Sequence, residues 1–135
     1  MDNIILKIVA EAYGITVSHI LSKNKKGKIP EARRMVVLFL NIPNCSPTKV
    51  ANSVNRERCF YYFALKKIAF ELQMYKEVTL KFKPIKMSLL NYLKTTKQEQ
   101  EAWLINNPCQ DQPKRGEIEA RLADINETYE YIINL

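Results

Sequence analysis

The chain contains very little glycine, and this excludes the common phosphate-binding loops. Its three glycines, Gly14, Gly27 and Gly116, lie too far apart for a Walker A loop or for the GxGxxG turn of dinucleotide-binding proteins. Chemistry that depends on ATP or NAD therefore lacks its usual binding motif in this sequence.

Cysteine and histidine are also scarce. The three cysteines, Cys45, Cys59 and Cys109, form no CxxC pair, and His19 is the only histidine. This set does not match the spacing of a zinc site, and the odd number of cysteines is typical of a reduced, cytoplasmic protein. A single histidine also leaves few residues for a nucleophile–base relay. We therefore expect no cofactor, no metal and no enzymatic activity.

Long apolar runs are missing as well. The longest, residues 59–65, is far too short to cross a bilayer, and the first residues lack the pattern of a signal peptide. We expect neither a secreted nor a membrane-embedded protein. The remaining composition, 135 residues with 47% hydrophobic and 26% charged side chains, is that of one soluble domain with or without an appendage.

Positive charge is concentrated in one part of the sequence. Residues 1–77 carry 13 basic and six acidic side chains, and residues 78–97 add five lysines without an acid. Residues 98–135, in contrast, carry three basic and eight acidic side chains. A basic front and an acidic rear are typical of a protein that is oriented by a polyanion. A solvated surface of uneven charge gives the same counts, so composition leaves both explanations open.

Local signals predict five helices in the first 77 residues. Apolar positions recur with helical spacing, Gly14 ends the first helix, and Ser46 and Pro47 begin the fourth. The expected helices span residues 2–13, 18–21, 30–40, 47–53 and 56–76, and a lysine-rich loop at residues 23–28 connects the second and third. The last two helices, joined by a tight turn, match the helix-turn-helix pattern.

The sequence resembles a known family in four stretches: IVAEAYGITVSHILSK at residues 8–23, the lysine-rich loop, ARRMVVLFL at residues 32–40, and ALKKI at residues 64–68. They are similar to the C-terminal DNA-binding domain of the bacterial replication initiator DnaA, over about residues 3–75. The resemblance implies an all-helical, Trp-repressor-like helix-turn-helix domain that reads a nonameric DNA box. In that family a recognition helix enters the major groove, and an arginine of the basic loop enters the minor groove.

The resemblance implies that the residues holding DNA are largely retained. Lys25 stands where the family has its minor-groove arginine, and Arg33 falls on a phosphate-contacting arginine. Lys23, Lys26 and Lys28 keep the loop basic. Lysine has the charge of arginine but not its planar fork, so we expect weaker reading of a narrow groove.

The residues that read bases in the family are changed here. The family's Gly-Gly-Arg-Asp-His-Ser/Thr-Thr segment becomes residues 55–60, one turn residue shorter, with Arg56 identical and Cys59 among the replacements. Arg58 can pair with guanine, Glu57 can accept from cytosine, and Phe60 can lie against a thymine methyl group. We therefore expect binding of double-stranded DNA without affinity for the family's own nonamer. The alternative is a recognition helix that has become scaffold.

The fifth predicted helix has two apolar faces. One is the expected core stripe, and the other consists of Phe60, Phe63, Phe70 and Met74. An isolated initiator-type domain does not need this second face, so we expect the C-terminal extension to cover it. Aromatic clusters of this kind are more often core than a base-stacking platform.

The extension, residues 78–135, shows no resemblance to a family. Alternation with period two at residues 78–83 predicts a short strand ended by Pro84. A capping box at residues 96–99 predicts a helix that reaches Asn106, and a polar turn is expected at residues 107–113. Five lysines in this part can lengthen a phosphate footprint: Lys81, Lys83, Lys86, Lys94 and Lys97.

The last helix is expected at residues 114–134. It carries an a/d seam made of Ile118, Leu122, Ile125, Tyr129 and Ile132. A seam this short serves either packing on its own domain or association with a second copy or a protein partner. The carboxylates of this helix have no histidine or cysteine at metal-ligand spacing, and we expect them to be solvated and to keep the extension away from DNA.

These observations predict an all-α, non-enzymatic DNA-binding protein with a domain at residues 1–77 and a helical extension at residues 78–135. Without the ATPase module of the DnaA family, it would act as a replication or transcription accessory factor in the cytoplasm, at the nucleoid. A different class, a protein-interaction module, would use the helix-turn-helix as scaffold. A nuclease or hydrolase would need clustered acids, whereas the six acids of residues 1–77 are scattered.

Overall fold

The computed structural model describes residues 2–43, 45–106 and 112–135, with the backbone alone for residues 112 and 113. These residues contain no strand, and their helices are α1 (Asp2–Tyr13), α2 (Val17–Leu21), α3 (Ile29–Leu40), α4 (Pro47–Ser53), α5 (Arg58–Met74), α6 (Lys76–Asn106) and α7 (Gln112–Ile133). The expected all-α class is confirmed, and the Trp-repressor-like assignment stays a prediction. The chain divides into two compact units, residues 1–86 and 87–135, whereas the sequence suggested a division after residue 77. None of the helices in this described part is long and apolar enough to span a membrane.

Helix boundaries in the first unit follow local capping signals. Gly14 has the left-handed φ of 66° and ends α1 as expected, with the Ile15 amide donating to the Ala10 carbonyl at 3.0 Å. The Ser46 side chain accepts from the Lys49 amide at 3.1 Å and begins α4 at Pro47. Local sequence signals therefore set both helix ends.

The start of α2 differs from the expected position at Ser18. Thr16 is the cap: its hydroxyl accepts from the His19 amide at 3.2 Å, and the Thr16 amide donates to His19 Nδ1 at 3.3 Å. This reciprocal pair is a capping box in which histidine takes the place of the usual glutamate. His19 therefore has a local structural role at the beginning of α2.

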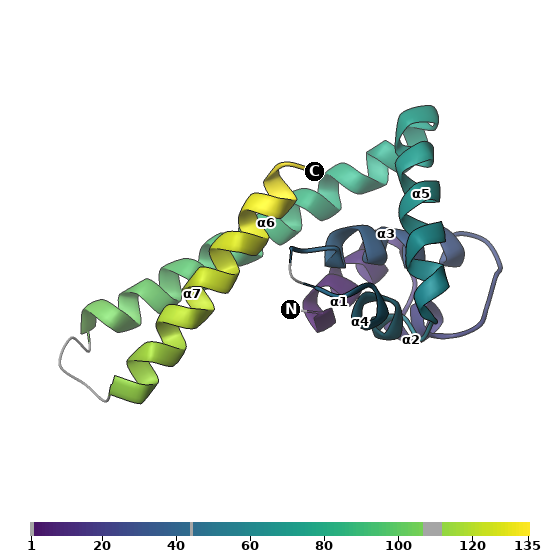
Figure 1. Ribbon diagram of the computed structural model, residues 1–135. Helices are drawn as coiled ribbons and strands as arrows, with labels where there is room; N and C mark the ends of the chain where they lie inside the picture. The colour runs from purple at the N-terminus through teal and green to yellow at the C-terminus, as the bar shows by residue number, and fades with distance from the viewer. Residues whose placement is uncertain (1, 44, 107–111) are drawn as a thin grey trace. The chain divides into compact units, whose positions relative to one another are not determined.

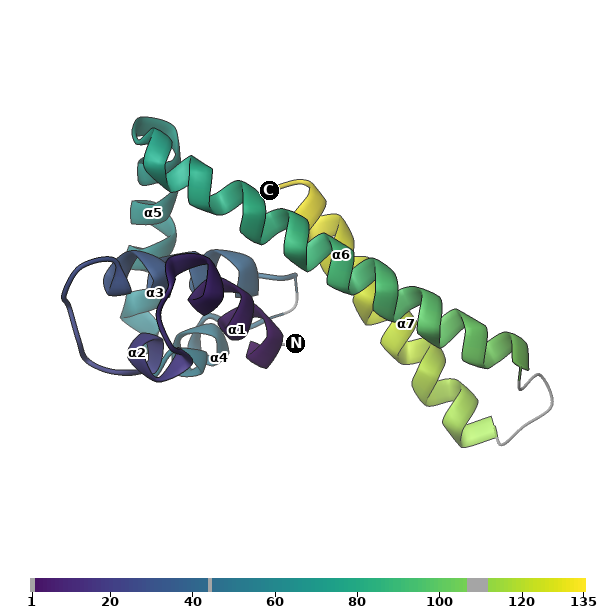
Figure 2. The ribbon, with the colours of Figure 1, turned by 180° about the vertical axis from the view of Figure 1, so that it is seen from behind.

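The core of the first unit surrounds α3 (Figure 1; seen from behind in Figure 2). Nine of the 12 residues of α3 are buried, two of which are Arg33 and Arg34. Fully buried side chains from five helices complete this core: Ile5, Val9, Ile20, Met35, Val36, Phe39, Ala51 and Ile68. Because buried charges are costly unless they are paired or hydrogen-bonded, the two arginines need partners inside the unit.

The predicted strand at residues 78–83 is wrong, because these residues form the first turns of α6. Val78, Phe82 and Ile85 are buried with helical spacings of four and three, whereas Leu80 is 68% exposed. The Phe82 ring stacks on Phe39 of α3 with 5.4 Å between ring centroids. The apolar residues of 78–83 alternate as in a strand, but the buried ones belong to a helical face that continues to Ile85.

Pro84 lies inside α6 and ends no element. A proline removes the hydrogen bond to the carbonyl four residues earlier, here that of Leu80. Both residues are exposed, so water can solvate this carbonyl. The helix start predicted at residues 96–99 is also wrong, because α6 continues through it and the Thr96 hydroxyl donates to the Tyr92 carbonyl at 2.9 Å.

Lys81 connects the beginning of α6 to the end of α1. Its ammonium donates to the Ala12 carbonyl at 3.1 Å and lies 5.6 Å from the centre of the Tyr13 ring. A cation at a helix C-terminus is favoured by the helix dipole. Burial, and then the Glu31 carboxylate, raise the pKa of Tyr13 well above its ordinary value. Lys81 was predicted to contact phosphate, and the structure shows that it also has a structural role within the first unit.

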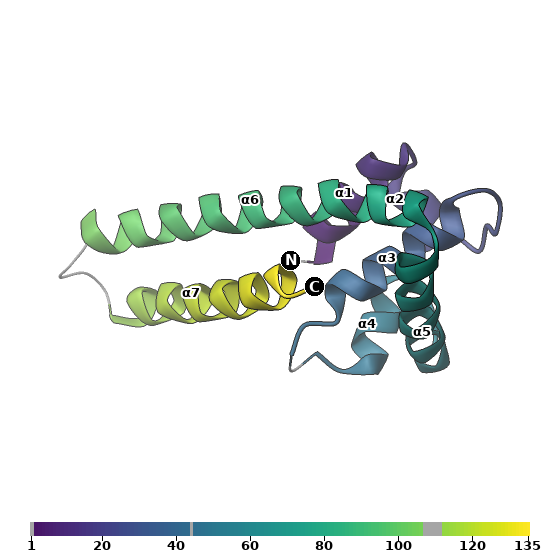
Figure 3. The same cartoon turned by 90° about the horizontal axis from the view of Figure 1, so that it is seen from above.

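The second unit is an antiparallel pair made of the later part of α6 and α7 (Figure 3). In the predicted seam of α7, Ile118, Ile125 and Ile132 are buried. The Lys114 ammonium lies 5.0 Å from the Trp103 ring centre. The seam thus packs within its own unit, and association with a second copy stays a prediction. Cys109 and most of the predicted turn at residues 107–113 lie outside the described residues.

Candidate nucleic-acid interface

A tight turn at residues 54–57 joins α4 to α5. Asn55 has a φ of 56°, its amide donates to the Asn52 carbonyl at 3.0 Å, and the Arg56 amide donates to the Ala51 carbonyl at 2.9 Å. Asparagine tolerates this left-handed conformation better than most residues with a Cβ atom. The Asn55 side-chain amide also donates to the Leu21 carbonyl at 3.2 Å, which attaches the turn to the end of α2.

Arg33 holds the beginning of the lysine-rich loop from inside the unit. Its Nε donates to the Ile20 carbonyl at 2.8 Å, and its Nη2 donates to the carbonyls of Ser22 at 2.7 Å and Asn24 at 3.2 Å. Arg33 is only 3% exposed. The phosphate contact expected of Arg33 is therefore corrected, because these donors serve main-chain carbonyls within the fold.

Arg56 fastens the turn to the same loop. Its Nη2 donates to the Ser22 carbonyl at 3.0 Å and its Nη1 to the Asn55 carbonyl at 3.1 Å. Its guanidinium also lies 5.8 Å from the centre of the Phe60 ring. Arg33 and Arg56 thus share the Ser22 carbonyl. Because of this shared acceptor, the lysine-rich loop lies beside the beginning of α5.

The four loop lysines remain exposed: Lys23, Lys25, Lys26 and Lys28. Lys23 and Lys25 border a hollow of about 320 Å³ together with Asn55, Arg56 and Glu57. Lys28 Nζ lies 3.8 Å from the Glu77 carboxylate, but both side chains are largely exposed, so this pair contributes little to stability. The loop therefore offers its charges to solvent next to the turn.

The first turn of α5 is exposed beside this loop. The helix begins at Arg58 and not at Arg56 as expected, and Glu57 is its cap residue without a side-chain capping hydrogen bond. Glu57, Arg58 and Cys59 are all exposed. Unpaired amides and a cationic side chain at a helix N-terminus favour an anion.

Tyr62 belongs to the same exposed surface, although the sequence analysis did not single it out. Arg58 Nη2 donates to the Tyr62 hydroxyl at 3.2 Å, and the guanidinium lies 5.9 Å from the ring centre. Tyr62 is 52% exposed. The signal in the sequence was the spacing of four residues from Arg58, which places both side chains on one helix face.

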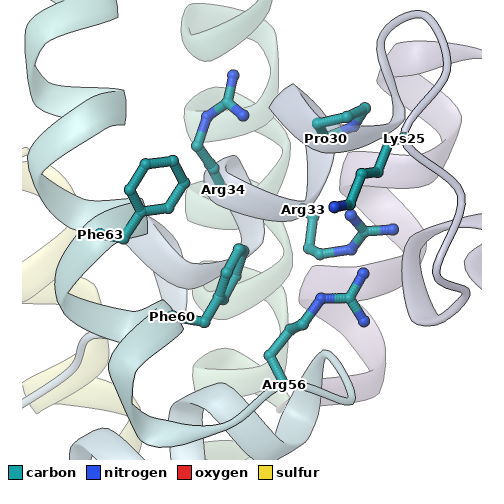
Figure 4. Close-up of a pocket in the computed structure, with 7 residues that line it drawn as sticks. All are labelled: Lys25, Pro30, Arg33, Arg34, Arg56, Phe60 and Phe63. Carbon is teal, nitrogen blue, oxygen red and sulfur yellow. The ribbon is translucent and has the colours of Figure 1, made fainter.

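Phe60 lies apart from Arg58 and Cys59, in the wall of a cavity of about 370 Å³ (Figure 4). Its lining residues come from the loop, α3, the turn and α5: Lys25, Pro30, Arg33, Arg34, Arg56, Phe60 and Phe63. The predicted site residues therefore separate into an exposed group, a cavity wall and the interior. The exposed group contains Lys23, Lys25, Lys26, Lys28, Glu57, Arg58 and Cys59, and Arg56 and Phe60 belong to the wall. Lys25 is exposed and also lines the cavity, and Arg33 is buried within its lining.

A buried ion pair fixes α5 against α3. Arg34 Nε lies 2.8 Å from Glu71 Oε1, and Arg34 Nη2 lies 3.0 Å from Glu71 Oε2. Both residues are 8% exposed. The sequence analysis did not anticipate this pair. The available signal was the position of Glu71 on the apolar stripe of Ala64 and Ile68, at helical spacing from both.

The remaining predicted charges are divided between the two units. Lys81, Lys83 and Lys86 belong to the first unit, whereas Lys94 and Lys97 belong to the second. On α7, Arg115 Nε lies 3.3 Å from Glu119, one turn further along. Within the described ranges, no three histidine, cysteine or acidic residues are placed to hold a metal ion.

No family model matches the chain, and no curated protein or solved structure matches it. The relation to DnaA therefore stays a prediction that rests on the residues quoted above. What the chain does has to be argued from the loop, the turn and the first turns of α5.

Proposed function

We propose that the chain binds double-stranded DNA, without enzymatic activity, through the loop at residues 23–28 and the beginning of α5. The observation that carries this proposal is the shared Ser22 carbonyl, which brings an exposed lysine cluster next to a helix N-terminus. This combination favours phosphate groups. The first unit also carries 16 basic and six acidic side chains, which favours approach to a polyanion.

The proposal includes a change in the sequence that is read. Phosphate contacts position a protein on DNA, and contacts to base edges specify the sequence. Glu57, Arg58 and Cys59 are exposed where they can reach base edges, and they differ from the readers of the DnaA family. Phe60 is withdrawn into the cavity wall, so we no longer assign it a thymine contact. We propose an accessory role in replication or transcription, without preference for the family's nonamer.

Fluorescence anisotropy with a labelled duplex tests this proposal. If the exposed lysines and the helix N-terminus neutralise about six phosphates, a plot of log K against log salt has a slope near −5, whereas a slope shallower than about −2 contradicts the proposal. Lys26→Glu should weaken binding several-fold. Lys7→Glu is the matched control, because Lys7 is exposed on α1 and its reversal changes net charge equally. Equal losses of duplex affinity in both variants would mean that the loop does not contact DNA more closely than the rest of the surface.

A selection from random duplexes at two salt concentrations tests the sequence preference. An enriched motif that differs from the DnaA nonamer supports altered reading by residues 57–59. Salt-sensitive retention without a motif supports phosphate binding alone. Enrichment of the DnaA nonamer itself contradicts the proposed change in specificity.

A protein-interaction module is the second candidate, and a specific observation favours it. Phe63 and Phe70 are each 53% exposed and Met74 is 63% exposed along α5 of the first unit. Exposed apolar patches commonly mark binding surfaces for proteins. If the chain is such a module, charge reversal of Lys25 and Arg58 would leave binding of the protein partner intact, and Phe70→Ser would abolish it. That the C-terminal extension covers this face stays a prediction.

A further inference from the structure

The cavity lined by Phe60 is large enough for a small ligand and combines two opposite kinds of wall. Its volume of about 370 Å³ lies within the range of small-molecule sites. Figure 4 shows the rings of Phe60 and Phe63 on one side, with Lys25 and Arg56 on the other. Arg33 of α3 and Arg56 of the turn before α5 both donate to the Ser22 carbonyl, which holds the loop at the cationic side of the cavity.

The apolar wall consists of aromatic rings. Phe60 and Phe63 lie three residues apart on α5, their ring centroids are 6.2 Å apart, and the rings are tilted by 48°. Phe63 is 53% exposed, and the Lys67 ammonium lies 5.5 Å from the centre of its ring. Aromatic faces of this kind bind nucleic-acid bases by stacking, with little dependence on the base.

The opposite wall is strongly cationic and contains little compensating negative charge. Among the residues that the structure describes, Lys25, Arg33 and Arg56 form no ion pair with a carboxylate. Arg33 and Arg56 donate to main-chain carbonyls instead, which leaves their formal charges in place. Burial, and then the positive charges of Arg56 and Arg34, lower the pKa of Arg33 from its ordinary value, as expected where like charges are crowded.

We infer that this cavity binds one unstacked nucleotide, with its base against the exposed ring of Phe63 and its phosphate at the cationic wall. Aromatic and cationic walls together select an aromatic anion. The choice of a nucleotide among aromatic anions rests on the proposed DNA binding by the neighbouring loop, which shares Lys25 with the cavity. The inference goes beyond duplex binding, because bases inside a duplex are stacked and do not reach such a site. The nucleotide is either free or an unpaired position in a strand.

Titrations with 2-aminopurine probes, followed by fluorescence anisotropy, test the inference. The probes are 2-aminopurine deoxynucleoside monophosphate, the same nucleoside without phosphate, and a single-stranded oligothymidine with one central 2-aminopurine. We expect the monophosphate or the single strand to bind, and the nucleoside to bind more weakly. Binding by the free monophosphate identifies a free nucleotide as a ligand, and binding by the strand alone identifies an unpaired position.

Matched variants assign the binding to this cavity. Phe63→Leu should weaken binding about five-fold or more, because a stacking ring is lost. Phe70→Leu is its control, since Phe70 lies on the same helix, is equally exposed and does not line the cavity. Lys25→Gln should weaken binding of the monophosphate but not of the nucleoside, and Lys7→Gln, at an exposed lysine of α1, should change neither. Circular dichroism checks that each variant is folded.

Two results overturn the inference. One is the absence of binding by both the monophosphate and the strand at millimolar concentrations, and the other is an equal effect of Phe63→Leu and Phe70→Leu. Duplex binding is measured on the same samples. A duplex that binds while both nucleotide probes fail refutes the cavity site alone, whereas a nucleotide that binds while the duplex fails refutes the proposed function alone.

Discussion

The buried pair of Arg34 and Glu71 gives the sharpest prediction about the first unit. In Glu71→Gln the side chain keeps its size and one carbonyl oxygen but loses its negative charge. Arg34 then stays 8% exposed, without its two charge-assisted hydrogen bonds of 2.8 and 3.0 Å. It also remains close enough to Arg33 for its charge to lower the pKa of that residue.

The expected loss in the free energy of unfolding is about 3–5 kcal/mol, the usual effect of removing one partner from a buried ion pair. Domains of ordinary size are stable by about 5–15 kcal/mol, so the variant would lose a large share of the stability of the first unit. Arg34→Met combined with Glu71→Leu should recover most of this loss. The double variant removes both charges and fills the space between α3 and α5 with apolar groups.

Urea unfolding followed by circular dichroism measures these changes, and amide hydrogen exchange in α3 assigns them to the first unit. Glu119→Gln is a control, because Glu119 pairs with Arg115 on the surface of α7, where the Glu119 side chain is 58% exposed. Removing an exposed pair of this kind should change stability by about 0.5 kcal/mol or less.

Two outcomes would refute the reasoning. If Glu71→Gln changes stability as little as Glu119→Gln does, the pair is solvated in solution and does not fix α5 on α3. If the double variant is as unstable as Glu71→Gln, then the loss comes from packing and not from an uncompensated charge.

Three further predictions concern the loop, the turn and the end of α1. In Arg33→Met, amide exchange at residues 22–28 should accelerate while exchange in α7 stays constant, because the loop carbonyls lose their buried donor; unchanged loop exchange would contradict this role. Asn55→Ala should be less stable than Asn55→Gly by about 1 kcal/mol in urea unfolding, because alanine is strained at a φ of 56°. Above about pH 10 stability should fall with pH, since Tyr13 ionises in the unfolded chain while its raised pKa keeps it protonated in the folded one, with a slope of up to about 1.4 kcal/mol per pH unit. Tyr13→Phe should be less sensitive to pH in this range, and an identical pH profile would count against the buried phenol.

The helices of the first unit could be predicted because their ends depend on nearby residues. Gly14 and Ser46 act within a few positions of themselves, so a single sequence is enough to place the ends of α1 and α4. The beginning of α6 could not be placed in this way. Its apolar side chains alternate over a short window, whereas in the fold Val78, Phe82 and Ile85 form a buried helical face and Phe82 packs on Phe39, far away in the sequence.

The sequence predicted the exposed charges of the candidate site but not the buried residues that hold its loop and helices in place. The lysines of the loop and the turn residues could be recognised as a cationic cluster from the sequence. Arg33, Arg34 and Glu71 look like ordinary surface charges there, because burial depends on the elements that enclose α3 and α5. Phe60 similarly looked like a base contact, and its place in the cavity wall depends on the course of the loop.

The way in which the loop is held has a consequence for how the protein can change. Arg33 and Arg56 donate to main-chain carbonyls, which every amino acid has. These contacts therefore do not depend on the side chains of the loop. Mutational drift at Lys23, Lys25, Lys26 and Lys28 can therefore alter the target while the scaffold persists. A library randomised at these four positions, with Asn24 and Gly27 kept for their local geometry, should consist mostly of folded proteins. The loop is thus a natural starting point for engineering new binding specificities.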